Sequence, residues 1–181
     1  MPPPSSGGIH LIQMLNILEN FDLKSMKHNS PSYVLLLNEV MKYAYADRSQ
    51  YLGDPDYVDV PVNKLISKGY AESISKKITI DRVTQSDDIK AGMYIDLESD
   101  ETTHFSIADK FGNLVSTTYT LNSSFGSKVV IAKTGILMNN EMDDFSSAPG
   151  VPNQFGLLGG KFNEIQTSKR PLSSMTPTIV F

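Results

Sequence analysis

The 181-residue chain contains no cysteine, which excludes a disulfide framework, thiolate metal sites, iron–sulfur clusters and cysteine nucleophiles. It also lacks a long hydrophobic run, because its longest strongly apolar stretch, Val34 to Leu37, is far too short to span a membrane. The formal charge of −4 gives no reason to expect nucleic acid or an anionic membrane as a partner. Hydrophobic residues make up 40% of the chain, enough to bury a core of single-domain size.

The two ends of the sequence are unusual for a complete domain. Met1 is followed by a stretch rich in proline, serine and glycine, residues 2–8, without the basic start or apolar core of a signal peptide. The last four residues, 178–181, are β-branched and apolar, and no turn or polar tail follows them. We therefore expect the chain to be a fragment of a longer protein.

The first half of the chain is predicted to be helical. Leucine and isoleucine at helical spacing predict a helix over 9–20 that is buried on most sides. The Ser-Pro pair at 30–31 is a typical start of a second helix, which should end near 53–55. A weaker helical pattern covers 62–74. Residues 79–101 are acidic, polar and aperiodic, and we interpret them as an exposed connector.

The second half is predicted to be mainly β-structure. Alternating residues over 103–108 and 114–121 predict a hairpin with a three-residue loop, in which Gly112 is left-handed. That loop sets the register, whereas a four-residue loop would shift it. Two further strands are predicted over 134–138 and 176–181.

Thr102 stands at the junction of the acidic connector and the hairpin. A threonine hydroxyl becomes a useful nucleophile when threonine is the first residue of a chain, because its α-amine then acts as the base. This requires a cut directly before Thr102, which an exposed linker tolerates. With the three-residue loop, Thr120 lies opposite Thr102 with Cβ atoms about 5 Å apart. On the pattern alone, an ordinary strand start is the commoner interpretation.

The other chemically active residue types indicate no cofactor or metal. His10, His28 and His104 have no second ligand at metal spacing, so solvated or capping roles are favoured. The glycine-rich run 156–161 lacks the Walker spacing and favours a flexible turn.

Five segments of the chain together resemble the γ-glutamyltranspeptidase (glutathione hydrolase) family. These segments are 1–19, 43–57, 102–127, 135–160 and 169–181. The resemblance implies an α+β N-terminal nucleophile hydrolase, an αββα sandwich that is present here only in part. It also implies a precursor that cleaves itself into a large and a small subunit. Residues 1–101 would then be the mainly helical C-terminal part of the large subunit, with the exposed connector at about 79–101. Residues 102–181 would be the mainly β N-terminal part of the small subunit.

The resemblance also assigns roles to individual residues. Autoproteolysis would cut between Glu101 and Thr102, Thr102 would be the nucleophile, and Thr120 would be its hydrogen-bond partner. The substrate α-amino group would be held by Asn122, Glu141 and Asp144, and the α-carboxylate by Ser173 and Ser174. Residues 146–156 match a lid loop, in which Phe155 stands where many bacterial relatives have a tyrosine.

The implied reaction moves a γ-glutamyl group from glutathione or a related amide to water, an amino acid or a peptide, without a cofactor. The implied partners are the remaining parts of both subunits, and the implied location is the periplasm or the exterior. In this family the carboxylate-binding arginine and the oxyanion-hole glycines lie outside residues 1–181. We therefore expect this chain alone to be inactive and uncleaved. The alternatives are a β-lactam side-chain (glutaryl) acylase of the same superfamily, and a non-catalytic, uncleaved binding or assembly module.

Overall fold

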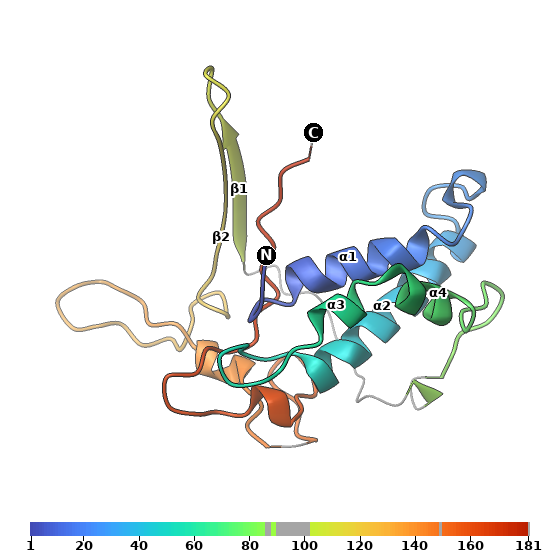
Figure 1. Cartoon of the computed structure of the whole chain (residues 1–181). Coiled ribbons are helices and arrows are strands. Elements are labelled where there is room, and N and C mark those ends of the chain that lie inside the picture. Colours follow the sequence, from blue (N-terminus) through green and yellow to red (C-terminus); the bar gives the residue numbers. More distant parts are fainter. Residues whose placement is uncertain (86–87, 90–101, 149, 181) are drawn as a thin grey trace.

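Helices form one side of the molecule, and a β-hairpin and irregular segments form the other (Figure 1). The computed structural model describes residues 1–85, 88–89, 102–148 and 150–180. The helices in these ranges are α1 (Gly7–Leu18), α2 (Pro31–Tyr51), α3 (Val62–Leu65) and α4 (Lys68–Ser75), with short 3-10 helices η1 (Leu23–Ser25), η3 (Glu141–Asp144) and η4 (Lys161–Asn163). None of the helices in the described ranges is long and apolar enough to cross a membrane.

The predicted start of the second helix is confirmed, and a serine caps its first turn. Ser30 precedes α2, and its hydroxyl accepts a hydrogen bond from the Tyr33 backbone N–H at 3.3 Å. The pattern over 62–74 forms two helices, α3 and α4, where one was expected. The break occurs because Ser67 caps α4 by accepting a hydrogen bond from the Tyr70 N–H at 3.2 Å.

Helix α1 buries a different face from the one its leucine spacing predicts. Leu11, Ile12 and Leu15 are 38%, 46% and 51% exposed, so the expected burial on most sides is wrong. The buried positions are Gly8, Ile9, His10, Gln13, Asn16 and Ile17. This face can turn inward because α1 packs against α2 and α4, and groups on the neighbouring segments accept hydrogen bonds from Gln13 and Asn16.

A buried hydrogen-bond network links α1, α2 and α4. His10 Nδ1 and Gln13 Oε1 lie 2.7 Å apart, and Gln13 Nε2 donates to Asp47 Oδ2 at 2.5 Å. The Tyr70 hydroxyl lies 3.0 Å from both carboxylate oxygens of Asp47. Burial lowers the pKa of His10 to about 4, so its ring is neutral at pH 7. The network therefore adds directional contacts to the packing of these three helices.

Two apolar clusters hold the helices together. The cluster between α1, α2 and α4 consists of Ile17, Leu36, Val40, Ala71, Ile74 and Ile78. The second cluster consists of Ile9, Leu52, Leu65 and Leu172. Leu172 comes from the C-terminal part of the chain, so this cluster attaches that part to the helices.

An ion pair fixes the same C-terminal segment to the turn after α2. Asp54 is fully buried, and it accepts hydrogen bonds from Arg170 Nη2 at 2.5 Å, Nε at 2.9 Å and the backbone N–H at 2.8 Å. The half-exposed guanidinium also donates to Asp56 Oδ2 at 2.6 Å. The hydrogen bonds from Arg170 hold the pKa of Asp54 well below its usual range.

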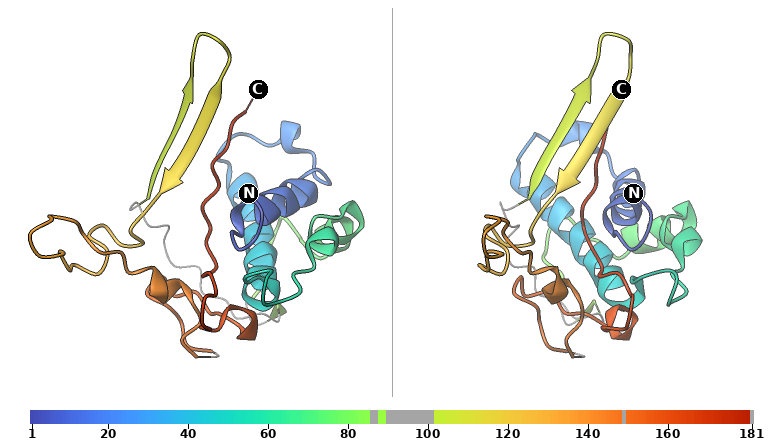
Figure 2. Two further views of the ribbon diagram at one scale, coloured as in Figure 1. Left: turned by 60° about the vertical axis from the view of Figure 1, so that its left-hand side comes forward. Right: turned by 90° about the vertical axis from the view of Figure 1, so that its left-hand side faces the viewer.

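The predicted hairpin and its register are confirmed. Strands β1 (Thr103–Ala108) and β2 (Leu114–Tyr119) pair antiparallel, from Thr103 opposite Tyr119 to Ala108 opposite Leu114. The Asp109 N–H donates to the Asn113 carbonyl at 3.0 Å and closes the three-residue loop. Gly112 is left-handed with φ +88°, as expected. In both views of Figure 2 the tip of the hairpin projects beyond the helices.

The two further strands expected in the second half are absent from the described residues. Residues 134–138 belong to an irregular arm that turns at residues 132–134 and is held by an isolated bridge between Val130 and Leu137. Residues 176–180 run beside the hairpin (Figure 2). The hydrogen bonds between the two come from hairpin side chains: the Ser106 and Ser116 hydroxyls donate to the Thr178 carbonyl, each at 3.2 Å. A strand needs backbone pairing, which these contacts do not supply. Phe181 and most of the expected connector, residues 86–87 and 90–101, lie outside the described residues.

Candidate active site

The amino end of β1 brings the first group of expected site residues together. The ladder ends with Thr103 opposite Tyr119, and one further step of the same register sets Thr102 opposite Thr120. Thr102 is exposed, and its hydroxyl has no hydrogen bond to another described residue. Thr120 Oγ1 accepts a hydrogen bond from the Asn122 N–H at 2.9 Å. Glu101, on the other side of the expected cut, lies outside the described residues.

Asn122 connects this group to a pair of acidic residues. It is buried, and its Nδ2 donates to the Asn140 carbonyl at 3.2 Å, directly before η3. Helix η3 carries Glu141 and Asp144, whose carboxyl groups interact electrostatically. Burial raises the pKa of both carboxyls, and for Asp144 the charge of Glu141 raises it further. Two interacting carboxyls of this kind form a site that a cation would stabilise.

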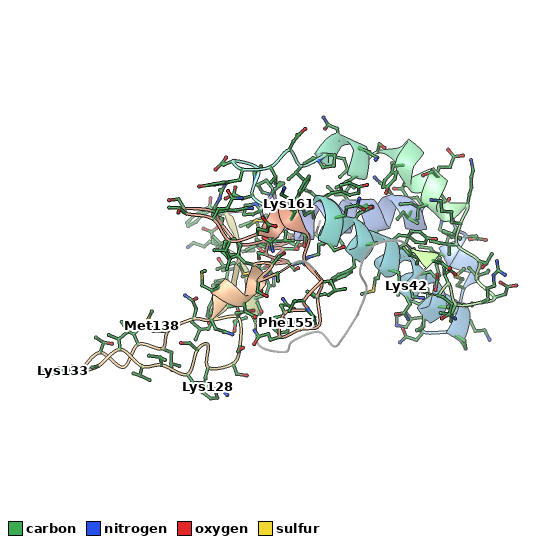
Figure 3. All side chains as sticks on the ribbon, turned by 90° about the horizontal axis from the view of Figure 1, so that it is seen from below. Lys42, Lys128, Lys133, Met138, Phe155 and Lys161 are labelled. Carbon is green, nitrogen blue, oxygen red and sulfur yellow. The ribbon has the colours of Figure 1, made fainter. Side chains whose placement is uncertain are left out.

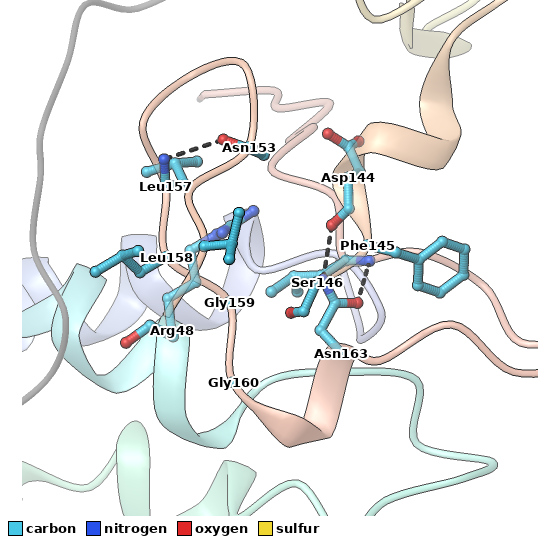
Figure 4. A pocket seen from close by; sticks show the side chains of 13 residues that line it. Arg48, Asp144, Phe145, Ser146, Asn153, Leu157, Leu158, Gly159, Gly160 and Asn163 are labelled. Carbon is cyan, nitrogen blue, oxygen red and sulfur yellow. Dashed lines mark hydrogen bonds between the residues drawn. The ribbon is translucent and has the colours of Figure 1, made fainter. Parts of the chain in front are cut away.

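A pocket separates this acidic pair from α2. Asp144 lines the pocket, and Arg48 reaches into it from α2 (Figure 4). The Asn163 Nδ2 donates to the Asp144 carbonyl at 2.6 Å, and the Ser146 N–H donates to the Asn163 carbonyl at 2.9 Å. These bonds fix the wall of the pocket that carries Asp144. The positive charge of Arg48 lowers the pKa of Asp144, against the larger effects of burial and Glu141.

Ser173 and Ser174 lie against the amino-terminal segment of the chain. Ser5 and Ser173 form an isolated parallel bridge, in which the Ser6 N–H donates to the Ser173 carbonyl at 2.7 Å. The Ser6 and Ser174 hydroxyl oxygens are 3.2 Å apart. The segment that begins the chain therefore positions the two expected carboxylate-binding hydroxyls.

The expected lid loop folds back over the acidic residues. Asn153 Oδ1 accepts hydrogen bonds from the Phe155 and Leu157 N–H groups, both at 3.0 Å, which makes a tight turn. Gln154 bonds to two neighbouring parts of the site: its N–H donates to Asp143 Oδ2 at 2.9 Å, and its Oε1 accepts from the Ser123 hydroxyl at 3.0 Å. Figure 3 shows Phe155 close to the body of the molecule and Lys133 at the far tip of the irregular arm. Gln154, the residue before Phe155, therefore makes polar contacts between the loop and the site.

The structure brings only some of the expected site residues together. Of these residues the pocket contains Asp144 alone, and none of the following line it: Thr102, Thr120, Asn122, Glu141, Phe155, Ser173 and Ser174. Sequence reasoning missed Arg48, Ser6 and Gln154, although each lies inside a segment that carries the family resemblance. The nearest signal in the sequence is the Ser5-Ser6-Gly7-Gly8 run at the unusual start of the chain.

Comparison with solved structures defines the class of fold. The cephalosporin acylase from Bacillus halodurans superposes with a TM-score of 0.70 at 25% identity, covering 97% of this chain and 28% of that chain. The described helices and hairpin are consistent with an α+β fold, of which this chain holds a part.

Comparison with known sequences defines the family. A glutathione hydrolase proenzyme of Escherichia coli is 56% identical over 180 residues, covering 99% of this chain and 31% of that protein. An acylase ACY 1 proenzyme of a Pseudomonas species is 42% identical over 176 residues, covering 97% of this chain and 29% of that protein. The family profile of γ-glutamyltranspeptidase matches residues 1–181, and the chain belongs to that family. It spans about a third of the length of these relatives.

Proposed function

We propose that this chain is the central part of a proenzyme that hydrolyses and transfers γ-glutamyl groups of glutathione and related amides. The Escherichia coli relative is named a glutathione hydrolase proenzyme, and the shared sequence covers nearly all of this chain. Residues 1–101 would end the large subunit and residues 102–181 would begin the small one. As the resemblance implies, the mature enzyme would act in the periplasm or outside the cell.

Autoproteolysis would come first. The Thr102 hydroxyl attacks the carbonyl carbon of Glu101, and the acyl group moves from the nitrogen to the oxygen. Water then hydrolyses the ester, which leaves the carboxylate of Glu101 and the free α-amine of Thr102. In the mature enzyme that amine takes the hydroxyl proton while Oγ1 attacks the γ-glutamyl carbonyl. The leaving amine departs with a proton, and water or an acceptor amine releases the γ-glutamyl group.

The observation that carries this proposal is the register of the hairpin. It supports Thr120 as the partner of Thr102, because one further pair of the ladder sets them opposite each other. The Thr120 hydroxyl is held by the Asn122 N–H, so it has a fixed place at the start of the small-subunit segment. A threonine nucleophile at a strand end needs such a partner to orient its hydroxyl.

The acidic pair supports a substrate with an amino group. Burial raises the pKa of Glu141 and of Asp144, and the charge of Glu141 raises that of Asp144 further; the ammonium of a γ-glutamyl group would favour the ionised form of both. Asn122, which bonds to the residue before this pair, would supply an amide oxygen to the same ammonium. Ser173 and Ser174 would donate to the α-carboxylate, and Phe155 would close the lid over the site by packing.

Exposed apolar side chains support further subunit segments as partners. Among them are side chains on the outer face of α1 and on the hairpin: Leu11, Ile12, Leu15, Phe105, Ile107 and Val115. Clustered apolar surface is usually covered in an assembled protein. We expect the remaining parts of both subunits to cover it.

Replacement of the nucleophile tests the function. Thr102→Ala in the full-length proenzyme should leave one uncleaved chain by intact-mass measurement, and its turnover of a γ-glutamyl anilide should fall by at least about 10³-fold. Thr103→Ala is the matched control, because the neighbouring threonine has no role in the mechanism, and it should still be cleaved at 101/102. A Thr102→Ala proenzyme that cleaves itself and turns over would overturn the proposal. An uncleaved, inactive wild-type proenzyme that forms a discrete oligomer would favour the non-catalytic module instead.

The acylase relatives make a glutaryl substrate the second candidate. A glutaryl group lacks the ammonium, so it would leave Glu141 and Asp144 without a cation, and an unpaired buried polar group is costly. The wild-type proenzyme should therefore prefer a γ-glutamyl anilide to a glutaryl anilide in kcat/KM. The opposite preference would assign the chain to the acylases.

A further inference from the structure

Arg48 is a cation in the candidate site that the proposed mechanism does not use. It lies near the end of α2, in the part of the chain before the expected cut, and it lines the pocket with Asp144 (Figure 4). No described carboxylate lies within ion-pair distance of its guanidinium. Placing a guanidinium in a pocket without a paired carboxylate costs free energy, so its presence there indicates a role in the site.

The first contact of Arg48 leads to the expected carboxylate-binding hydroxyls. Its Nε donates to the Ser6 hydroxyl at 3.2 Å, and that hydroxyl lies 3.2 Å from the hydroxyl of Ser174. Because Nε–H only donates, it leaves the Ser6 proton free to point at Ser174. Ser174 then accepts from Ser6 and keeps its own proton for a substrate carboxylate.

The backbone around Ser6 holds this relay, the hydrogen bonds from Arg48 to Ser6 and from Ser6 to Ser174, in place. The Ser6 N–H bonds to the Ser173 carbonyl at 2.7 Å, and the Ser5 hydroxyl donates to the Met175 carbonyl at 2.7 Å. A Cβ on Gly7 would collide with Thr176 Oγ1, so the two segments approach as closely as only glycine allows. The relay is therefore held on both sides of Ser174.

The second interaction of Arg48 is with Asp144. The charged groups that act on Asp144 are Glu141 and Asp143 of its own helix, which oppose its ionisation, and Arg48 of α2, which favours it. Arg48 is thus the cation among them. An ionised Asp144 is what a substrate ammonium requires.

We propose that Arg48 and Ser6 are positioning residues of the γ-glutamyl site: Arg48 orients Ser174 through Ser6 and keeps Asp144 ready to bind an ammonium. This inference rests on the proposed function, because Ser174 and Asp144 take their roles from it. Arg48, a side chain of the large-subunit segment, would then act on the α-carboxylate site through Ser174 and on the α-ammonium site through Asp144.

The test uses the full-length proenzyme with Ser6→Ala, Arg48→Met and Arg48→Lys. The substrates are a γ-glutamyl anilide and a 4-aminobutyryl anilide, which keeps the ammonium and lacks the carboxylate. Ser6→Ala and Arg48→Met should raise KM for the γ-glutamyl anilide about five- to tenfold, and should lower the preference over the 4-aminobutyryl anilide by the same factor. A purely structural defect would lower kcat for both anilides alike.

The pH profile separates the two roles of Arg48. Arg48→Met should move the acidic limb of kcat/KM to higher pH, because loss of the cation makes Asp144 harder to ionise. Arg48→Lys should keep that limb near its wild-type place but not restore KM, since an ammonium does not reproduce the Nε–H geometry. Ser6→Ala should leave the limb unchanged. Arg82→Met is the matched control, because this exposed arginine contacts Thr79 outside the site.

Wild-type KM and preference in Ser6→Ala, or a wild-type acidic limb in Arg48→Met, would overturn the proposal. If Arg48→Met fails to fold, Ser6→Ala and Arg48→Lys still decide it through KM. A wild-type proenzyme without turnover of the γ-glutamyl anilide would instead count against the proposed function.

Discussion

The helical region and the β-hairpin use their apolar side chains in opposite ways. In the helical region, Leu36 and Ile17 are completely buried between α1, α2 and α4. In the hairpin, Ile107 is 57% exposed, and every residue of β1 is exposed. A two-stranded hairpin without a second layer has little stability of its own. The helices are thus stabilised by their own core, whereas the hairpin takes its shape from local pairing and offers its faces to other segments.

The largest expected effect is a cavity in the helical core. Leu36→Ala should lower the free energy of unfolding of this chain by about 2–5 kcal/mol, because no neighbour fills the lost volume. Ile107→Ala, the matched change in the hairpin, should alter it by less than about 0.5 kcal/mol, since the side chain is exposed. Urea unfolding followed by helical circular dichroism measures both. Equal losses would contradict the contrast between the two regions.

The ion pair between Asp54 and Arg170 joins the helical region to the C-terminal segment, and its loss should have an intermediate effect. Asp54→Asn should destabilise the chain by about 2 kcal/mol, below the usual cost of breaking a buried pair, because Arg170 is half exposed. Asp56→Asn removes the exposed partner of the same guanidinium and should cost less than about 0.5 kcal/mol. Thermal unfolding of the two variants checks this order, and a larger loss from Asp56→Asn would refute it.

The same pair predicts a pH dependence of stability. The folded state depresses the pKa of Asp54, so the stabilisation is complete above the unfolded pKa of about 4 and is lost as the pH falls below it. Between pH 6 and pH 3 the wild-type chain should therefore lose more stability than Asp54→Asn. Parallel pH curves for the two proteins would show that Asp54 makes no such contribution.

The smallest expected effect concerns two glycines with open space around them. Gly112 has φ +88°, so Gly112→Ala should destabilise the hairpin loop by about 1 kcal/mol. Gly69 lies inside α4 without a positive φ, and Gly69→Ala should stabilise by about 0.5–1 kcal/mol. Unfolding midpoints of both variants test this, and a shift of the same sign in both would contradict it.

Local rules predicted the elements whose shape depends on neighbours in the sequence. A serine before proline marked the start of α2, and a three-residue loop ending in Gly112 set the register that brings Thr102 and Thr120 together. The expected strand over 134–138 forms only an isolated bridge to Val130, and residues 176–180 have no partner backbone among the described residues, which no local pattern supplies. Residues with a role by resemblance, such as Asn122 and Ser174, were found through family segments.

Chain order and residue type alone thus determined the family, the hairpin register and the position of the candidate nucleophile. Only the tertiary structure decided that α1 turns His10 and Gln13 inward, because that choice depends on Asp47 and Tyr70 in other helices. The same holds for Arg48, whose contact with Ser6 spans 42 residues of sequence. Contacts between residues so far apart arise from packing, and packing is what a local pattern does not contain.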